Sequence, residues 1–517
     1  MNGYLRRLAT TGAAYTASSV LSKLFAVAFL PLYTRHVSPE GFGAAEVLTV
    51  AAVAAAITIR LGLIEAVMRF YYAERERPED IVRTGFAAML LLSVVGVAAL
   101  MPFAGPISRA LLDTSEPGLA RIAIAGVGVF VLYDYMLTLY RLDERAKAYF
   151  AFTIANVLIT IPVTVWLVVV KDEAARGLLI GQFGVGAVIL AGLIVVQRRR
   201  LGLVPDPALL RRMARFGLPM MPAELSLYSL SFIDRILIVH LIGLGKAGLY
   251  ALAVKFAQGV QVLVRGFQLA YPPLAYSIAD DEEARQAYAD IVSWFLAACT
   301  FVVVGMWLFS RWIVRFLAAP EFFGAHEAVG LISTGVMLYA LYFVMVVIIG
   351  RTNRTELSFP ATVAGTAANI GLNLALVPPL GIVGAGLALV ASYLVILAVM
   401  YVLTQRLFPV PYQWRRIGQV ALIAAAVTVP GEMLLPDEGL GGLVMRGLVW
   451  LAFPLLLWVT RFPSLGERVA LARNLRPSML RERLRSLRAS PIPAGAGAGG
   501  GAVPEALEVE IRDEDRL

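Results

Sequence analysis

The sequence has one cysteine and three histidines in 517 residues, and only 16% of its residues are charged. The single cysteine, Cys299, allows no disulfide within the chain and no cysteine-based metal site. His36, His240 and His326 are far apart, and none belongs to an HExxH motif or another metal-ligand spacing. The sequence also lacks a GxxxxGK[ST] phosphate-binding loop, so we do not expect it to hydrolyse ATP. We therefore expect no metal, no cofactor and no catalytic residues.

Hydrophobic residues are abundant instead, at 59% of the chain, and the mean hydropathy is +0.76. Soluble globular proteins contain about 45–50% apolar and about 25% charged residues. The apolar residues form long blocks, such as 85–103 and 329–350, each near the ~20 residues that cross a bilayer as a helix. The net charge of +9 resides mostly in short loops between these blocks, which argues against nucleic acid as a partner. The composition predicts an all-α integral membrane protein.

We predict about fourteen membrane-spanning helices, the first of them a retained helix and not a cleaved signal peptide. The predicted spans are 12–34, 45–68, 84–104, 119–140, 149–170, 177–197, 217–242, 248–275, 290–310, 328–350, 358–378, 382–404, 417–434 and 442–461. If the N-terminus is cytoplasmic, the inside segments carry more than twice the lysines and arginines of the outside loops. By the positive-inside rule, both termini are therefore expected in the cytoplasm.

A weak internal repeat divides the spans into two halves. Shifting the sequence by 205 residues aligns spans 1 and 2 with spans 7 and 8, and it matches Arg60 with Arg265 and Gly43 with Gly248. Both copies start on the same side, which is typical of transporters whose substrate binds between parallel repeats. The predicted domains are an N-lobe (1–197), a basic cytoplasmic linker (198–216), a C-lobe (217–404), two further spans (405–462) and a basic, low-complexity tail (463–517).

Polar residues inside the predicted spans recur at helical spacing. In span 8, Lys255, Gln258, Gln261, Arg265 and Gln268 fall within an arc of about 140° over roughly 20 Å of helix. Span 1 carries a similar polar face that includes Lys23, and span 7 carries one with Glu224, Tyr228, Ser231 and Arg235. Because charged side chains are costly in a bilayer, these three faces are expected to line one hydrated cavity between the halves.

The candidate binding residues follow from these stripes and from other charges within the spans. They are Lys23, Arg60, Glu65, Glu224, Tyr228, Asp234, Arg235, Lys255, Gln258, Gln261, Arg265 and Gln268. The deepest are mainly cationic, which suits an anionic group such as a pyrophosphate or an acidic sugar. Asp234 and Arg235 lie near a span end, where they could also pair locally, and Glu46 lies at a span edge, where hydration is expected.

Two stretches of the sequence resemble the polysaccharide transporter family of the multidrug/oligosaccharidyl-lipid/polysaccharide flippase superfamily. The stretch AANIGLNLALVPPLGIVGAGLALVAS (367–392) is similar to the family's span 11–12 signature and adds Asn369 and Asn373 to the candidate site. The stretch DRILIVHLIGLGKAGLYALAVKFAQ (234–258) resembles its span 7–8 passage. The resemblance covers roughly residues 5–460. It implies two six-helix lobes related by a pseudo-two-fold axis, two extra helices, a MATE-like fold and alternating access.

The resemblance also implies a function. Members of that family are flippases that move undecaprenyl-pyrophosphate-linked oligosaccharide repeat units across the bacterial inner membrane, for surface polymers such as lipopolysaccharide O-antigen, capsule or exopolysaccharide. The expected partners are this lipid-linked substrate and membrane lipids, with a polymerase and glycosyltransferases as further candidates.

Three alternatives remain open at the level of sequence. A lipid II flippase of the same superfamily would share the pyrophosphate and the prenyl tail. A cation-coupled multidrug exporter would need an acidic cavity, which the cationic stripe of span 8 argues against. A membrane glycosyltransferase would need carboxylates beside a large outside loop, and the predicted outside loops are short.

Overall fold

The computed structural model describes Leu21, Phe25, Arg354 and residues 27–72, 77–352, 357–464 and 467–468, and every regular element in this part of the chain is helical. The main helices are α2 (Leu30–Thr34), α3 (Pro39–Arg60), α4 (Leu63–Tyr71), α5 (Pro78–Leu100), α6 (Ala104–Leu112), α7 (Pro117–Leu142), α8 (Ala146–Val165), α9 (Ala174–Gln197), α10 (Pro207–Gly217), α11 (Met221–Ile242), α12 (Leu244–Ser277), α13 (Asp281–Leu317), α14 (His326–Arg351), α15 (Ser358–Leu407), α16 (Trp414–Leu434) and α17 (Gly439–Val459). Short 3-10 turns at Met101–Phe103 and Pro320–Ala325 and a π-helical turn at Trp166–Val170 adjoin them.

Eleven described helices are long and apolar enough to cross a membrane, or twelve if the two segments of α11, bent by 43°, form one span. One of the eleven, α15, has 50 residues, about 75 Å if straight and more than twice the ~30 Å of a hydrocarbon core. It is broken at Gly381, whose φ of 62° and ψ of −140° suit a residue without Cβ. This break falls between the predicted spans 358–378 and 382–404. The chain is a multi-pass membrane protein, and the predicted count of fourteen is not confirmed.

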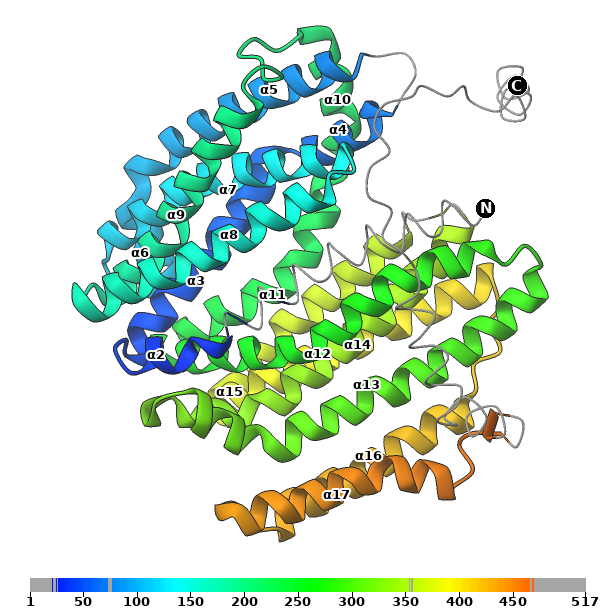
Figure 1. Cartoon of the computed structure of the whole chain (residues 1–517). Coiled ribbons are helices and arrows are strands. Elements are labelled where there is room, and N and C mark those ends of the chain that lie inside the picture. Colours follow the sequence, from blue (N-terminus) through cyan, green and yellow to red (C-terminus); the bar gives the residue numbers. More distant parts are fainter. Residues whose placement is uncertain are drawn as a thin grey trace, which may run out of the picture. The chain divides into compact units, whose positions relative to one another are not determined.

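The helices of residues 39–197 pack mainly among themselves, and so do those of residues 221–407 (Figure 1). In the first group, α7 contacts α3, α5 and α9, and α8 packs on α9. In the second group, α14 is central, because it packs against α12, α13 and α15. The two groups meet through α3, which also packs on α11 and α12. One helix of the first half is therefore the main contact with the second half.

The predicted span 45–68 is not one helix. Ser38 caps the N-terminus of α3 through the backbone N–H of Gly41, and Pro39 occupies the first turn, so the helix starts earlier than predicted. At the other end, Leu61 and Gly62 adopt left-handed conformations, with φ of 51° and 66°, and the chain turns into α4. The prediction of a continuous helix was wrong because the apolar pattern continues across Leu61 and Gly62. That pattern does not indicate a change of backbone conformation limited to two residues.

The predicted linker 198–216 contains α10 and is attached to the first group of helices. Arg200 binds the carboxylate of Asp143, at the end of α7, with two hydrogen bonds, the longer of 2.9 Å, and Tyr71 donates another to it at 2.9 Å. Partial burial alone would raise the pKa of Asp143, but the bonds from Arg200 and Tyr71 lower it below the ordinary value. The carboxylate therefore stays charged at neutral pH, and the linker stays anchored.

Two glycines bring α3 and α12 into backbone contact. A Cβ on Gly248 would lie 2.0 Å from the carbonyl oxygen of Pro39, and a Cβ on Gly43 would lie 2.5 Å from that of Leu244. Gly43 and Gly248 occupy equivalent positions of the 205-residue repeat. Contact between equivalent residues is the arrangement expected where an approximate two-fold axis passes between two repeats.

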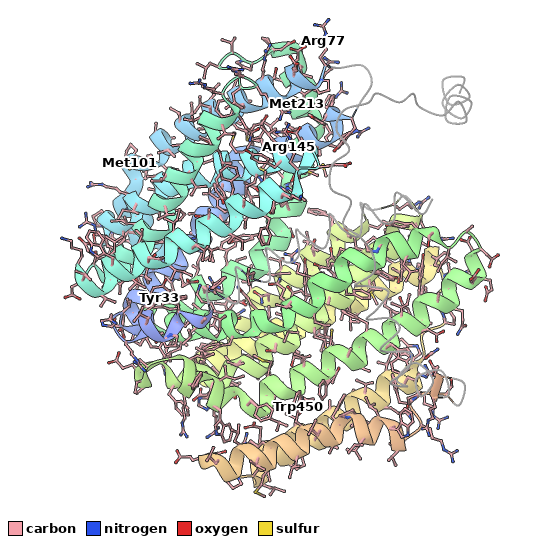
Figure 2. The ribbon with its side chains drawn as sticks, in the orientation of Figure 1. Tyr33, Arg77, Met101, Arg145, Met213 and Trp450 are labelled. Atoms are coloured by element: carbon pink, nitrogen blue, oxygen red, sulfur yellow. The ribbon has the colours of Figure 1, made fainter. Side chains whose placement is uncertain are left out.

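The last two spanning helices attach to the rest through α13. On α17, Trp450 stacks on Phe301, with ring centroids 4.4 Å apart, and donates a hydrogen bond to its carbonyl oxygen (Figure 2). Arg446 of the same helix is wholly buried and donates to the carbonyl oxygen of Leu308. The predicted basic, low-complexity tail (463–517) lies almost wholly outside the described residues, as does most of the predicted first span.

The backbone contact of α3 and α12 predicts that Gly248→Ala destabilises the protein. Alanine normally stabilises a helix by about 1 kcal/mol relative to glycine, but here its methyl group would overlap the carbonyl of Pro39, and overpacking costs about 1–3 kcal/mol. Thermal unfolding of the purified protein in detergent measures the change. Gly371→Ala is the matched control because nothing lies within 4 Å of its Cβ position in α15. Equal melting temperatures for the two variants would contradict the contact.

Candidate functional site

The polar face of α11 packs along α3. The contacts, in order along α11, are Glu224 with the guanidinium of Arg60, Tyr228 with the carbonyl oxygen of Val50 at 3.2 Å, and Arg235 with Glu46 at 3.5 Å. Residue numbers rise along α11 and fall along α3, so the two helices run antiparallel. The sequence predicted that this face lines a cavity. In the described structure, its three polar groups bind the facing helix.

Glu46 joins α3 to both α11 and α12. Its carboxylate lies 2.8 Å from the ammonium of Lys255 and 3.5 Å from the guanidinium of Arg235, and its side chain is 16% exposed. The expectation of a hydrated residue at a span edge was wrong, because α3 begins at Pro39 and places Glu46 two turns inside the helix. The carboxylate of Glu46 is therefore paired with two cations from two different helices.

Arg60 binds two carboxylates from different helices. Its side chain is 8% exposed and makes a 2.7 Å ion pair with Asp134 of α7 and a second ion pair with Glu224 of α11. Arg141 lies 3.7 Å from the same Asp134. Arg60 was predicted as a cation open to substrate, and this structure shows it neutralised by two acids. Asp134 was not among the candidate site residues, because its pairing with Arg60 depends on the tertiary fold.

Asp234 holds three helices of the second half together. It is 1% exposed and accepts hydrogen bonds of 2.9 Å from the hydroxyl of Tyr250 in α12 and from the amide of Asn373 in α15. The same amide donates to the backbone carbonyl of Asn369, one turn earlier. The structure thus brings Asp234, Asn369 and Asn373 together, three residues that sequence analysis had assigned to the site from separate stretches.

Arg265 differs from the other candidate cations. Its side chain is exposed, and no described carboxylate lies within ion-pair distance. The sequence explains why Arg265 lacks the ion pairs of Arg60, its equivalent in the 205-residue repeat. The residues equivalent to Asp134 and Glu224 are Tyr339 and Ser19, and neither is acidic. The other members of the span 8 stripe, Gln258, Gln261 and Gln268, are half-buried, as is Glu65 on α4, and Lys23 lies outside the described residues.

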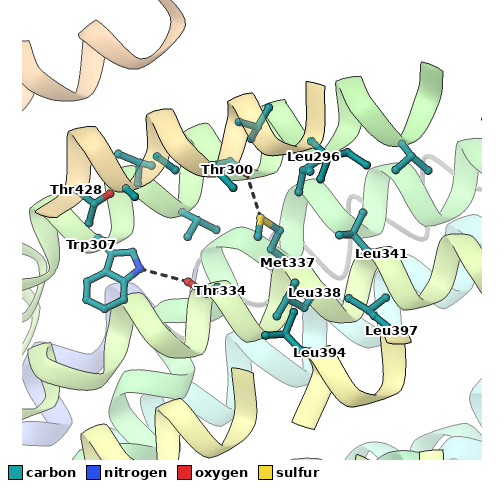
Figure 3. Close-up of a pocket in the computed structure, with 18 of the residues that line it drawn as sticks. Leu296, Thr300, Trp307, Thr334, Met337, Leu338, Leu341, Leu394, Leu397 and Thr428 are labelled. Carbon is teal, nitrogen blue, oxygen red and sulfur yellow. Dashed lines mark hydrogen bonds between the residues drawn. The ribbon is translucent and has the colours of Figure 1, made fainter. Parts of the chain in front are cut away.

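An apolar cavity of about 950 Å³ lies among α13, α14, α15 and α16 (Figure 3). Aliphatic residues such as Leu338 and Leu394 dominate its lining. Two hydrogen bonds drawn in Figure 3 pair polar groups of the wall: Trp307 donates to the hydroxyl of Thr334 at 3.3 Å, and the hydroxyl of Thr300 donates to the sulfur of Met337 at 3.4 Å. Such a lining offers contact to hydrocarbon but few hydrogen bonds to a polar molecule.

A second, polar cavity of about 250 Å³ lies among α2, α3, α8 and α9, with Lys255 of α12 in its wall. Sequence analysis missed its residues on α8, although Asn156, Thr160 and Thr164 recur at steps of four residues and face the cavity together. The same criterion of polar residues at helical spacing that singled out span 8 would have found them.

Comparison with known proteins places these features in a wider context. Residues 9–276 match the model of the family described as polysaccharide biosynthesis protein. A curated relative, the succinoglycan biosynthesis transport protein ExoT of Rhizobium meliloti, is 26% identical over 318 residues. The match covers 60% of this chain and 62% of the relative, so it spans less than two thirds of that protein.

Solved structures share the fold. The lipid II flippase MurJ in an inward closed conformation aligns with a TM-score of 0.69 and 13% identity, over 88% of this chain and all of that one. An inward-facing multidrug resistance MATE transporter of the MOP superfamily aligns with a TM-score of 0.63 and 16% identity, over 74% of this chain and 94% of its own. The predicted MATE-like fold is therefore confirmed.

The ion pairs of Arg60 predict a measurable contribution to stability. Arg60→Ala leaves Glu224 without its cation and Asp134 with only Arg141, at 3.7 Å, and we expect a loss of about 1–3 kcal/mol. A wholly buried pair would lose more, but these two carboxylates are 30% and 33% exposed. Glu224→Gln should cost less, because Asp134 still binds the guanidinium.

Thermal unfolding in detergent, extended to the double variant Arg60→Ala/Glu224→Ala, measures the coupling between the two side chains. Arg83→Ala is the control, because its pair with Glu79 is 4.0 Å long and exposed. Strictly additive effects of Arg60→Ala and Glu224→Ala would contradict the interaction.

Proposed function

The chain belongs to the family of polysaccharide biosynthesis proteins, and from this premise we propose that it is a flippase for lipid-linked oligosaccharides. Its substrate would be an undecaprenyl-pyrophosphate-linked repeat unit, carried across the bacterial inner membrane by alternating access between the two groups of helices. Such a molecule combines a long hydrocarbon tail, a pyrophosphate and sugars, so its carrier needs surfaces of different chemistry. The observation that carries the proposal is the presence of an apolar cavity and an exposed, unneutralised arginine in one membrane-spanning protein.

The apolar cavity fits the prenyl tail. Its lining is almost entirely aliphatic and aromatic, and its volume of about 950 Å³ lies at the upper end of ligand cavities. A flexible hydrocarbon chain gains contact there without leaving polar groups unsatisfied. Glu432, the charged residue of the lining, is held by the buried Arg446 at 2.6 Å, so its charge is compensated within the protein.

Arg265 fits the pyrophosphate. Its guanidinium carries a permanent charge and five N–H donors, a geometry that matches phosphate oxygens. Arg60 and Lys255 already bind carboxylates, so in the described structure they are less available to an anion. The anionic group of the substrate is therefore assigned to Arg265, with the glutamines of the same stripe as additional donors.

Alternating access would require α3 to separate from α12. With both termini in the cytoplasm, as the loop charges predict, the contact of Gly43 with Gly248 lies toward the outer face of the membrane. The described structure would then be closed on the outside. Opening to the outside would separate this backbone contact and also the ion pair between Glu46 and Lys255.

A lipid II flippase, the main alternative, would also use a cation and an apolar cavity, and likeness of fold at 13% identity does not separate the two. A multidrug exporter for cationic drugs is disfavoured because Glu46 is already paired with two cations and because Arg265 is exposed. Purified protein in proteoliposomes, supplied with a fluorescent undecaprenyl-pyrophosphate-linked oligosaccharide or with fluorescent lipid II, distinguishes the candidates. We expect transfer of the first lipid between leaflets, and transfer of lipid II alone would overturn the proposal.

The assignment of the pyrophosphate predicts that Arg265→Ala lowers transfer of the lipid-linked oligosaccharide at least about tenfold, because a charge-assisted hydrogen bond contributes about 1.5–3 kcal/mol. Arg265→Lys should retain part of the activity, since it keeps the charge and loses the fork of donors. The proteoliposome assay measures both. Arg121→Ala removes an exposed arginine near the start of α7 and serves as the control. Undiminished transfer by Arg265→Ala would exclude this residue from the site.

The assignment of the tail predicts that Ala425→Trp, which places an indole in the apolar cavity, lowers transfer of the full substrate by roughly tenfold, the effect of losing about 1.4 kcal/mol of tail binding. A water-soluble analogue without the prenyl tail should bind both proteins equally. Ala426→Trp is the matched control, because this neighbouring exposed residue of α16 is not part of the cavity lining. Equal transfer rates for the two tryptophan variants would contradict a tail site there.

A further inference from the structure

The polar cavity combines polar and apolar groups in one wall. It contains hydroxyls, amides, aromatic rings and one ion pair, together with the aliphatic side chains of Ala45, Val157, Ile161 and Leu178. The residues that matter for the argument are Tyr33, Phe42, Thr49, Asn156, Thr160 and Gln182, beside the pair of Glu46 and Lys255. A wall of this composition offers both donors and acceptors, and it also offers the apolar faces of Tyr33 and Phe42.

Several of these polar groups remain available. Thr49 and Gln182 make no hydrogen bond to any described residue, although both belong to helices that span the membrane. Thr160 donates a long hydrogen bond of 3.3 Å to the side-chain oxygen of Asn156, so these two side chains form a paired polar patch on α8. Polar side chains inside a membrane protein usually face a cavity or a partner. In this case they face the cavity.

Charge excludes a cation as the preferred occupant. The one carboxylate of the wall, Glu46, is already paired with Lys255 at 2.8 Å and with Arg235 at 3.5 Å, so it is not free to bind a cation. The described residues also contain no group of three or more His, Cys, Asp or Glu side chains placed to bind a metal ion. A neutral polyhydroxyl group is compatible with both the wall and its charge.

The volume limits the size of the occupant. About 250 Å³ is below the roughly 300–1,000 Å³ of sites for drug-sized ligands and well above the ~30 Å³ that one water molecule occupies. This leaves room for one sugar ring with its hydroxyl groups. The ring's hydroxyls can bond to the amides and hydroxyls, while its C–H faces can pack on Tyr33 or Phe42.

We propose that the polar cavity binds one sugar residue of the oligosaccharide, a proposal that rests on the function proposed above. The site then recognises the sugar, while Arg265 recognises the pyrophosphate and the apolar cavity takes the tail. Lys255 belongs to α12, whereas the rest of the wall belongs to α2, α3, α8 and α9. Separation of α3 from α12 therefore removes the lysine from the cavity and opens the sugar site at the same step.

Cysteine labelling tests the sugar site independently of the lipid carrier. In a Cys299→Ala background, which removes the one native thiol, Thr160→Cys places a thiol in the polar cavity and Thr428→Cys places one in the apolar cavity. The probes are lactose, maltose and N-acetylglucosamine, added to the full-length protein in proteoliposomes with a maleimide. We expect at least one sugar to slow labelling at position 160 but not at position 428. Unchanged labelling at position 160 with every sugar would overturn the proposal.

A binding measurement then separates this proposal from the function on which it rests. The probes are undecaprenyl pyrophosphate with and without an attached N-acetylglucosamine. Asn156→Ala/Gln182→Ala should weaken binding of the sugar-bearing lipid about five- to tenfold, the usual effect of losing hydrogen bonds to a ligand, and leave the sugar-free lipid unaffected. Arg265→Ala should weaken both. Equal effects of the double alanine variant on the two lipids would overturn the sugar site. If the parent protein binds neither lipid, the proposed function fails, and the labelling result alone decides the sugar site.

Discussion

The carboxylate of Glu46 is the interaction on which the arrangement of the two halves depends. A charged group within a bilayer is costly unless it has a partner, and three such groups, Glu46, Arg235 and Lys255, come from three different helices. They are compensated only where α3 lies against α11 and α12. The glycine contact beside them lets the backbones of α3 and α12 approach closely enough for the lysine to reach the carboxylate. Charge and shape thus specify the same contact.

The repeat makes the two halves alike in backbone but not in charge. Arg60 and Arg265 are equivalent in the repeat, yet Arg60 has Asp134 and Glu224 beside it, while Tyr339 and Ser19 stand at the positions equivalent to those acids. One arginine is therefore part of the contact between helices, and the other remains available for a ligand. In the proposed carrier, only one of the two equivalent arginines is therefore free to bind an anion.

The polar stripes show how far sequence reasoning reached at the site. Helical spacing correctly grouped Glu224, Tyr228 and Arg235 on one face of α11, since that grouping depends only on the geometry of a helix. It could not show that the face meets Arg60, Val50 and Glu46 of α3, which are 164 to 189 residues away in the chain. A polar face in a membrane has two possible neighbours, water or another polar face, and a single helix does not distinguish between them.

The sequence by itself determined that this is a helical membrane protein, where most of its helices lie, and that residues 358–378 and 382–404 are separate segments, because these properties depend on local hydrophobicity. It also determined the family, through stretches of residues that keep their order. Only the tertiary structure decided which charges are neutralised, which glycines touch, and that an apolar and a polar cavity exist. Those properties depend on contacts between helices that are distant in the chain. The energy of such a contact depends on both partners, so it cannot be inferred from either helix alone.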